Sequence, residues 1–245
     1  MTTFFKYSFV LLWKCWFFIV FGCYLFLFSP FLLVVTARQS WYGLFFKVIR
    51  VWARLILWTS GLGITKEDAI DFSVRENYMF IANHTSILDI LLMLVITKNP
   101  FVFVGKKELG KIPLFGFFYK RTCILVDRSS VSSKANAFRV AQQRIHSGLS
   151  ICIFPEGLVP DDPSIVLSAF KGGAFHLAVA HQLTLVPMTF LDCKKRLPYI
   201  LFLGGPGVLR VRMHPFIDTT HMDTSSVTEL KQHCYDLLYK DLISE

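Results

Sequence analysis

The hydrophobic pattern divides the chain into an apolar N-terminal part and a longer part with alternating periodicities. Residues 15–36, CWFFIVFGCYLFLFSPFLLVVT, carry no charge and are long enough to cross a hydrocarbon layer, which takes about 20 residues. Residues 41–58, WYGLFFKVIRVWARLILW, place Lys47, Arg50 and Arg54 at helical spacing among apolar side chains. That pattern predicts an amphipathic helix lying in a membrane interface. We therefore predict an N-terminal membrane-embedded segment of two helices.

Two questions about this segment stay open at the level of sequence. A cleaved signal peptide is disfavoured, because the apolar run exceeds the ~7–15 residues of a signal core and no clean cleavage site follows it. A single crossing and a hairpin that enters and leaves by one face fit equally well. Basic residues between 38 and 66 outnumber Lys6 and Lys14. The positive-inside rule therefore predicts that the rest of the chain lies on the cytoplasmic face of a cell inner membrane or its equivalent.

After about Glu67 the pattern changes to short apolar runs that alternate with helical stretches. Runs predicted as buried strands are 78–82, 101–105, 123–127, 151–155 and 183–190. Predicted helices are 86–95, 132–146, 170–181 and 225–243. Strands separated by helices predict an α/β fold with a mostly parallel sheet flanked by helices. Residues 199–205 and 208–215 predict a late hairpin. We expect two domains: 1–66 as the membrane anchor and 67–245 as the catalytic domain.

Composition and charge support the membrane assignment. Hydrophobic residues make up 53% of the 245 residues, and the formal net charge is +9. No acidic residue precedes Glu67, whereas seven lysines and arginines do. Basic charge mixed with Trp, Phe and Leu fits an anionic lipid surface better than nucleic acid. Six cysteines without a CxxC pair are interpreted as reduced and structural.

The stretch NHTSILDI, residues 83–90, places His84 and Asp89 directly after a predicted strand. Five residues apart on one continuous helix, the two side chains would point about 140° apart. If His84 lies in the turn before the helix and Thr85 or Ser86 caps it, Asp89 can reach back to the imidazole. The carboxylate would then fix the tautomer, leaving the other nitrogen to take a proton from a substrate hydroxyl. By itself the spacing is a weak motif.

Two further stretches follow predicted strands with charged side chains. Lys106 and Lys107, in GKKELGKIPLFG, and Arg128, in VDR, would meet at the carboxyl edge of a parallel sheet, where such folds bind ligands. Convergent cations there would hold a phosphate or another anionic head group. The alternative for each stretch is an ordinary solvated basic loop.

A tight turn forms the third candidate. Glu156 and Gly157 lie in FPEG, where a carboxylate can accept hydrogen bonds from substrate hydroxyls or from backbone donors. AFKGGAF follows, with Lys171 at a predicted helix start. The alternative here is a glycine-rich turn that only allows close helix packing.

In this order the stretches resemble the glycerolipid acyltransferase family of the 1-acylglycerol-3-phosphate acyltransferase (PlsC) type. The family's N-H-x-x-x-x-D block resembles Asn83, His84 and Asp89, and its F-P-E-G block resembles residues 154–157. Its block K-K/R-x-L-x-x-x-P-x-x-G, running on to D/N-R, matches Lys106, Lys107, Leu109, Pro113, Gly116, Asp127 and Arg128. F-K-x-G and V-P follow at 170–173 and 186–187.

This resemblance implies transfer of a fatty acyl group from acyl-CoA or acyl carrier protein to the hydroxyl of a lysophosphatidate-like glycerolipid, in phospholipid biosynthesis. His84 would be the general base and Asp89 its orienting partner. Substrate-binding residues would be Lys106, Lys107, Arg128, Glu156, Gly157 and Lys171. We expect neither a metal nor an organic cofactor in this chemistry. The family's two-helix membrane motif matches what the hydrophobic pattern predicts independently.

One departure from the family opens an alternative acceptor. The family commonly continues F-P-E-G with T-R-S, whereas this chain reads FPEGLVPDDPS. The usual arginine is missing and Asp161 and Asp162 follow, so a zwitterionic or amino-acid-containing lyso-lipid is an alternative to lysophosphatidate.

Two rival functions remain at this stage. A membrane lipid hydrolase could use the same His/Asp pair to activate water, although the sequence has no G-x-S-x-G elbow. A non-enzymatic lipid-binding or anchoring protein would have no need of His84 or Asp89.

Overall fold

A computed structural model describes residues 2–67 and 76–244, which belong to two compact units. The first unit consists of three segments of the chain, Met1–Glu67, Thr85–Thr97 and Phe190–Arg212. The second unit consists of the segments Asp68–His84, Lys98–Thr189 and Met213–Glu245. The expected division into a membrane anchor, 1–66, and a catalytic domain, 67–245, stays a prediction.

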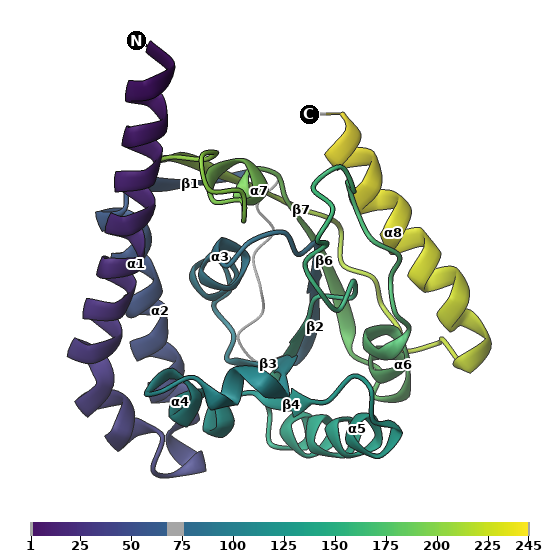
Figure 1. Ribbon diagram of the computed structural model, residues 1–245. Helices are drawn as coiled ribbons and strands as arrows, with labels where there is room; N and C mark the ends of the chain where they lie inside the picture. Colours follow the sequence, from purple (N-terminus) through teal and green to yellow (C-terminus); the bar gives the residue numbers. More distant parts are fainter. Residues whose placement is uncertain (1, 68–75, 245) are drawn as a thin grey trace. The chain divides into compact units, whose positions relative to one another are not determined.

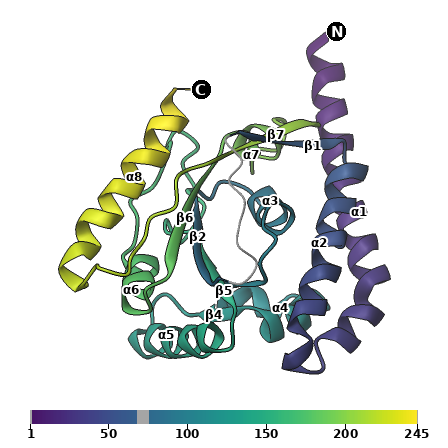
Figure 2. The ribbon, with the colours of Figure 1, turned by 180° about the vertical axis from the view of Figure 1, so that it is seen from behind.

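In the first unit, two long helices lie side by side (Figures 1 and 2). Its elements are α1 (Thr2–Val35), η1 (Gln39–Trp41), α2 (Tyr42–Thr59), β1 (Leu62–Glu67), α3 (Leu88–Ile96), α7 (Cys193–Arg196) and most of β7 (Gly207–Met213). Val10, Trp13, Phe17 and Val20 are buried at helical spacing along α1. The Phe21 ring contacts Trp52 of α2, with centroids 5.0 Å apart. The two predicted helices therefore pack on each other along an aromatic seam.

The outer side of α1 is apolar and exposed. Within α1, Phe4–Val35 is long and apolar enough to cross a membrane, with a mean hydropathy of 2.5 in its most apolar stretch. Exposed large side chains on this helix include Phe4, Leu12, Phe18, Ile19, Phe26, Phe31 and Val34. Contiguous apolar surface of this kind is typical of contact with lipid or with another protein.

The basic residues of α2 do not all face outward. Arg50 Nε donates to the Leu94 carbonyl oxygen at 3.1 Å, and its Nη2 donates to that of Val95 at 3.3 Å. Both carbonyls belong to the last turn of α3, so the guanidinium satisfies acceptors that a helix end leaves open. Arg50 therefore caps the C-terminus of α3. The interfacial position of α2 stays a prediction.

The second unit is built on a parallel sheet with strand order β6-β2-β5-β3-β4. Its strands are β2 (Tyr78–Ala82), β3 (Phe101–Lys106), β4 (Ile124–Val126), β5 (Ser150–Ile153) and β6 (Thr184–Phe190). Its helices are η2 (Lys107–Lys111), α4 (Phe115–Thr122), α5 (Val131–His146), α6 (Gly173–Ala180), η3 (Thr224–Ser226) and α8 (Val227–Ile243). Helices α5, α6 and α8 lie beside these strands (Figures 1 and 2). The predicted α/β class, a mostly parallel sheet with flanking helices, is confirmed.

The predicted late hairpin is wrong. Residues 199–205 form no strand, and β7 pairs in parallel with β1, with Leu62 opposite Gly207 and Glu67 opposite Arg212. Gly204 and Gly205 have φ of 117° and 145°, a region that favours glycine and interrupts a strand. The apolar run before them therefore forms a loop, whereas the true partner of β7 lies 145 residues away, and local pattern does not reveal it.

Gly116 marks the point where α4 approaches η2 most closely. A Cβ at Gly116 would overlap the Gly110 backbone carbonyl, whereas one at Gly173 would meet no atom within 4 Å. Backbone cannot move aside as a side chain can, so we expect Gly116→Ala to destabilise the protein by roughly 1–3 kcal/mol. The matched variant Gly173→Ala should be neutral or slightly stabilising. Urea unfolding measures both, and equal midpoints for the two variants would contradict the expectation.

Candidate active site

The register of two parallel strands brings the histidine block and the FPEG block together. Strand β2 pairs with β5 so that Ile81 lies opposite Ile153. Three residues beyond each of these lie His84 and Glu156. The backbone N–H of His84 donates to Glu156 Oε1 at 2.6 Å. Two motifs that are 72 residues apart thus meet at the carboxyl edge of the sheet, where the sequence places them.

The imidazole of His84 is fixed by stacking. Its ring lies on that of Phe154, with centroids 4.4 Å apart and an interplanar angle of 16°. Phe154 in turn lies nearly parallel to Phe103, at 6.1 Å. His84 itself is half-buried. The ring is therefore held in one plane while remaining accessible, which proton exchange with a substrate requires. The sequence showed Phe154 only as the first letter of the FPEG motif and gave no sign of its stacking on His84.

Both carboxylate oxygens of Glu156 accept hydrogen bonds from backbone donors. Oε1 takes the His84 N–H, and Oε2 takes the Ser168 N–H at 2.8 Å. The residue is only 2% exposed. The sequence left two possible partners for the Glu156 carboxylate, substrate hydroxyls or backbone N–H groups. In the structure it accepts hydrogen bonds from backbone N–H groups. Glu156 thus joins the backbone at His84 to the segment that leads into α6.

Burial raises the pKa of Glu156 above its usual value, and the hydrogen bonds from the Ser168 and His84 amides oppose the rise. The folded protein therefore holds this proton more tightly than the unfolded chain does. Its contribution to the free energy of unfolding is complete below the usual glutamate pKa and is lost as pH rises through the raised pKa. We expect wild-type stability to fall more steeply than that of Glu156→Gln over this window. Urea unfolding at a series of pH values measures the stability of both proteins. Parallel curves of stability against pH for wild type and Glu156→Gln would contradict this expectation.

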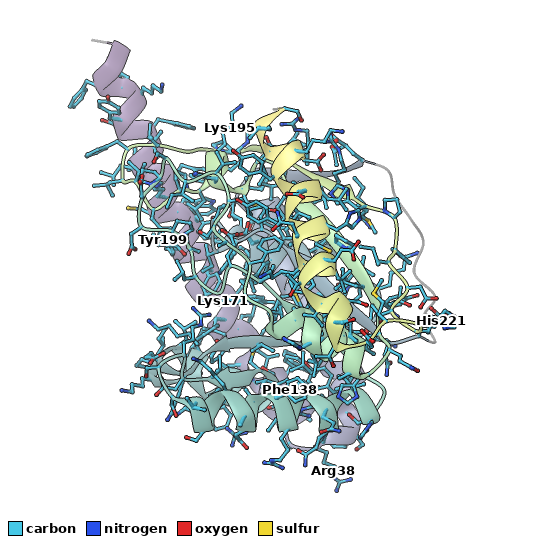
Figure 3. All side chains as sticks on the ribbon, turned by 90° about the vertical axis from the view of Figure 1, so that its right-hand side faces the viewer. Arg38, Phe138, Lys171, Lys195, Tyr199 and His221 are labelled. Atoms are coloured by element: carbon cyan, nitrogen blue, oxygen red, sulfur yellow. The ribbon has the colours of Figure 1, made fainter. Side chains whose placement is uncertain are left out.

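Lys171 covers the turn at Gly157. Its backbone N–H donates to the Pro155 carbonyl at 2.9 Å. Gly157 has a φ of 77°, and a Cβ there would come within 2.8 Å of Lys171 Nζ. The glycine therefore provides both the backbone conformation and the space for the lysine. Lys171, labelled in Figure 3, lies two residues before α6 begins at Gly173, close to the predicted helix start.

Tyr119 interacts with the Lys106 backbone and with the charge of Arg128. Strand β3 pairs with β4 so that Lys106 lies opposite Val126, two residues before Arg128. Burial raises the pKa of Tyr119, while the charge of Arg128 and a hydrogen bond to the Lys106 backbone act against the rise. Lys106 and Lys107 are exposed and Arg128 is half-buried. The expected convergence of these cations at one edge is consistent with this register. Tyr119, which the sequence did not single out, hydrogen-bonds to the Lys106 backbone.

Asp89 belongs to the first unit and is fully buried. Its Oδ2 accepts the backbone N–H groups of Thr85 at 2.6 Å and of Ser86 at 2.8 Å. Helix α3 begins at Leu88, whose N–H donates to Ser86 Oγ. The carboxylate is thus turned back toward the residues that immediately follow His84. The N-cap position of α3 is Ile87, which makes no side-chain capping bond, and not Thr85 or Ser86 as expected. Direct pairing of the imidazole with the carboxylate stays a prediction.

Cys193 adds to the surroundings of Asp89. Burial raises the pKa of its thiol well above the usual value, and the charge of Asp89 and a side-chain hydrogen bond to it act in the same direction. All six cysteines are free thiols. Across residues 2–67 and 76–244, no three His, Cys, Asp or Glu side chains are grouped so that they could hold a metal ion.

Comparison with known proteins decides the family. The family model described as Acyltransferase matches residues 64–191, more than half of the chain. This chain belongs to the acyltransferase family. The matched region of this acyltransferase includes every predicted site residue from His84 to Lys171, although the individual roles stay predictions.

Several curated relatives of this acyltransferase carry one name. The 1-acyl-sn-glycerol-3-phosphate acyltransferase of Salmonella typhimurium is 31% identical over 186 residues, covering 73% of this chain and 72% of that protein. The Escherichia coli protein of the same name is 30% identical over 180 residues, with the same coverage. The human protein 1-acyl-sn-glycerol-3-phosphate acyltransferase alpha is 25% identical over 209 residues, covering 81% of this chain and 71% of that protein.

A solved structure has the same fold. The crystal structure of the 1-acyl-sn-glycerophosphate acyltransferase PlsC from Thermotoga maritima matches with a TM-score of 0.78 at 19% identity. The match covers 99% of this chain and 97% of that one.

Proposed function

We propose that this acyltransferase moves a fatty acyl group from acyl-CoA or acyl carrier protein to the free hydroxyl of 1-acyl-glycerol-3-phosphate, with His84 as general base. The observation that carries the proposal is the His84–Glu156 hydrogen bond and the Phe154 stack. These contacts hold an accessible imidazole at the carboxyl edge of the sheet, where parallel α/β folds commonly bind ligands. The names of the relatives support the acceptor.

The proposed reaction exchanges one acyl bond for another. The imidazole takes the proton of the acceptor hydroxyl as its oxygen attacks the thioester carbonyl carbon. A tetrahedral intermediate forms, the C–S bond breaks, and an ester C–O bond remains. The thiolate leaves with the proton returned by the imidazolium. Asp89, turned toward the chain just after His84, would favour the imidazolium electrostatically.

Head-group recognition is proposed for the cations at the ends of β3 and β4. Reversal of charge in Lys106→Glu or Arg128→Glu would place an anion beside the acceptor phosphate. We expect each change to raise KM for lysophosphatidate by about 10-fold or more, because a charge-assisted hydrogen bond is worth roughly 1.5–3 kcal/mol. Steady-state kinetics measure KM. The exposed Lys134 gives the matched control, Lys134→Glu, and equal KM values for all variants would contradict the assignment.

The identity of the acceptor is tested by assays with a panel of lyso-lipids. Val159 stands where the family commonly has arginine, and Asp161 and Asp162 are exposed, so a zwitterionic lyso-lipid is the second candidate. Purified protein would be assayed with each acceptor and with both acyl-CoA and acyl carrier protein. We expect the highest kcat/KM with lysophosphatidate. A higher value for a zwitterionic lyso-lipid would replace the proposed acceptor while leaving the chemistry in place.

Membrane attachment is proposed for α1, with the remaining chain on the cytoplasmic side. The exposed apolar side chains of this helix support contact with lipid. Attachment would also concentrate the enzyme where its lipid acceptor is dissolved.

A further inference from the structure

An exposed apolar loop in the first unit is not explained by the chemistry above. From Leu197 to Leu209 the chain carries no charge. Its consecutive side chains are exposed although apolar: Tyr199 at 73%, Ile200 at 41%, Leu201 at 54%, Phe202 at 45% and Leu203 at 47%. We call residues 198–203 the apolar loop. Single exposed apolar residues are ordinary on protein surfaces, but five in succession indicate a binding surface.

The loop is closed at its base by Arg196. The guanidinium donates to the carbonyl oxygens of Pro206 at 3.1 Å and Val208 at 3.2 Å. The Gly205 N–H donates to the Arg196 carbonyl at 2.9 Å. The shape of the loop is therefore fixed before anything binds to it, which lowers the entropic cost of binding.

Lys14 ties the same loop to α1. This lysine is buried, and its Nζ donates to the carbonyl oxygens of Pro198 at 2.8 Å and Ile200 at 2.6 Å. Nearby, the Tyr7 ring contacts Phe202, with centroids 5.4 Å apart. A lysine within a lipid-facing helix is energetically costly unless its charge is satisfied. Here the two carbonyls satisfy it, so the loop extends the apolar surface of α1.

We propose that the apolar loop inserts into the lipid surface beside α1 as a second membrane contact. The occupant is a bilayer because the loop is continuous with the lipid-facing side of α1, and this part rests on the proposed attachment of that helix. Lys194 and Lys195 precede the loop, and Lys195 is exposed (Figure 3). Basic residues beside an inserted apolar segment lie at the level of anionic head groups.

Within the first unit, the loop also connects to the segment that follows His84. Ser86 Oγ donates to the carbonyl oxygen of Leu197, the residue just before the loop, at 2.7 Å. Insertion of the loop would thus hold the segment that carries Asp89 close to the membrane surface. An acceptor lipid would reach the enzyme without leaving the bilayer.

Photo-crosslinking tests the proposal. Benzoyl-phenylalanine would replace Tyr199, Phe18 on the outer side of α1, or Phe138, which is 39% exposed on α5. The full chain would be placed in vesicles of phosphatidylcholine and phosphatidylglycerol with acyl-tagged phosphatidylcholine, which is neither the proposed acceptor nor the product. We expect lipid labelling at Tyr199 and Phe18 and only background at Phe138. Labelling at Phe18 with background at Tyr199 would overturn the loop proposal alone. Background at both would contradict the membrane attachment of α1 as well.

The contact of Lys14 with the loop allows a second, independent experiment. Loss of a charged hydrogen bond shifts a local equilibrium by roughly tenfold or more, so Lys14→Met should lower labelling at Tyr199 by about that factor. Labelling at Phe18 should stay unchanged. Lys6→Met, at an exposed lysine of the same helix, is the matched control and should change neither. Unchanged labelling at Tyr199 in Lys14→Met would contradict the role of Lys14 in presenting the loop.

Discussion

Replacing His84 by alanine is expected to lower the turnover of acyl transfer by about 10²–10⁴-fold, the usual contribution of a general base. The imidazole is half-buried and stacked on Phe154, and the hydrogen bond to Glu156 uses the backbone N–H. Because alanine retains that N–H, the local backbone and the overall stability should change little. Initial rates with labelled acyl thioester, together with an unfolding midpoint, measure the two effects.

The matched control is His221→Ala, at an exposed histidine labelled in Figure 3. It should retain wild-type turnover. If His84→Ala also retained it, His84 would be neither the base nor a substrate contact.

Asp89→Asn extends the same test. An asparagine oxygen can still accept the N–H groups of Thr85 and Ser86, so the variant removes the charge while keeping a local acceptor. We expect it to fold and to lose most of its transfer activity, as an uncharged partner no longer favours the imidazolium. Asp236→Asn, at an exposed carboxylate of α8, is the control. Full activity in Asp89→Asn would remove Asp89 from the mechanism.

Replacing Glu156 by alanine is expected to have the second large effect, on stability and activity together. Its carboxylate takes the N–H groups of His84 and Ser168 in a buried position. Leaving a buried donor without a partner costs about 1–3 kcal/mol, so losing both acceptors should cost roughly 2–6 kcal/mol. Turnover per folded molecule should also fall, by about 10²-fold if His84 moves by as little as 1 Å. Unfolding curves and kcat, corrected for the folded fraction, give the two numbers.

Glu156→Gln separates the two effects. It keeps one acceptor oxygen but presents an NH₂ group to the other amide donor, so its loss of stability should lie between those of wild type and alanine. Glu108→Gln, at an exposed carboxylate, should match wild type. Wild-type stability and turnover in Glu156→Gln would show that this carboxylate does not position His84.

The parts of the fold that the sequence predicted well are those with local periodicity. Strand β2 was predicted as 78–82 and is Tyr78–Ala82, because five consecutive apolar residues bounded by polar ones define a buried strand. Strand β1, LGITKE, was missed because it mixes polar and apolar residues along one edge. Without β1, local pattern pairs β7 with the apolar run just before it and so predicts a hairpin. Pairing between distant segments is not encoded in local pattern.

The site was predictable where parallel strands end. His84, Arg128 and Glu156 follow strands of one parallel sheet, and Lys106 is the last residue of another of its strands. This topology alone places them along one edge. The actual use of Glu156, as an acceptor of two backbone N–H groups, depends on tertiary contacts with Ser168. The same holds for Phe154 under His84 and for Lys14 at the apolar loop. These contacts involve backbone atoms or ring faces, which residue type and spacing do not specify.

The most direct test of the central claim follows a labelled acyl thioester in the presence and absence of lysophosphatidate. With wild-type protein, the account predicts that the label moves to the diacyl product, only when the acceptor is present and not with His84→Ala. Release of free fatty acid at the same rate with or without acceptor would contradict it and identify a hydrolase.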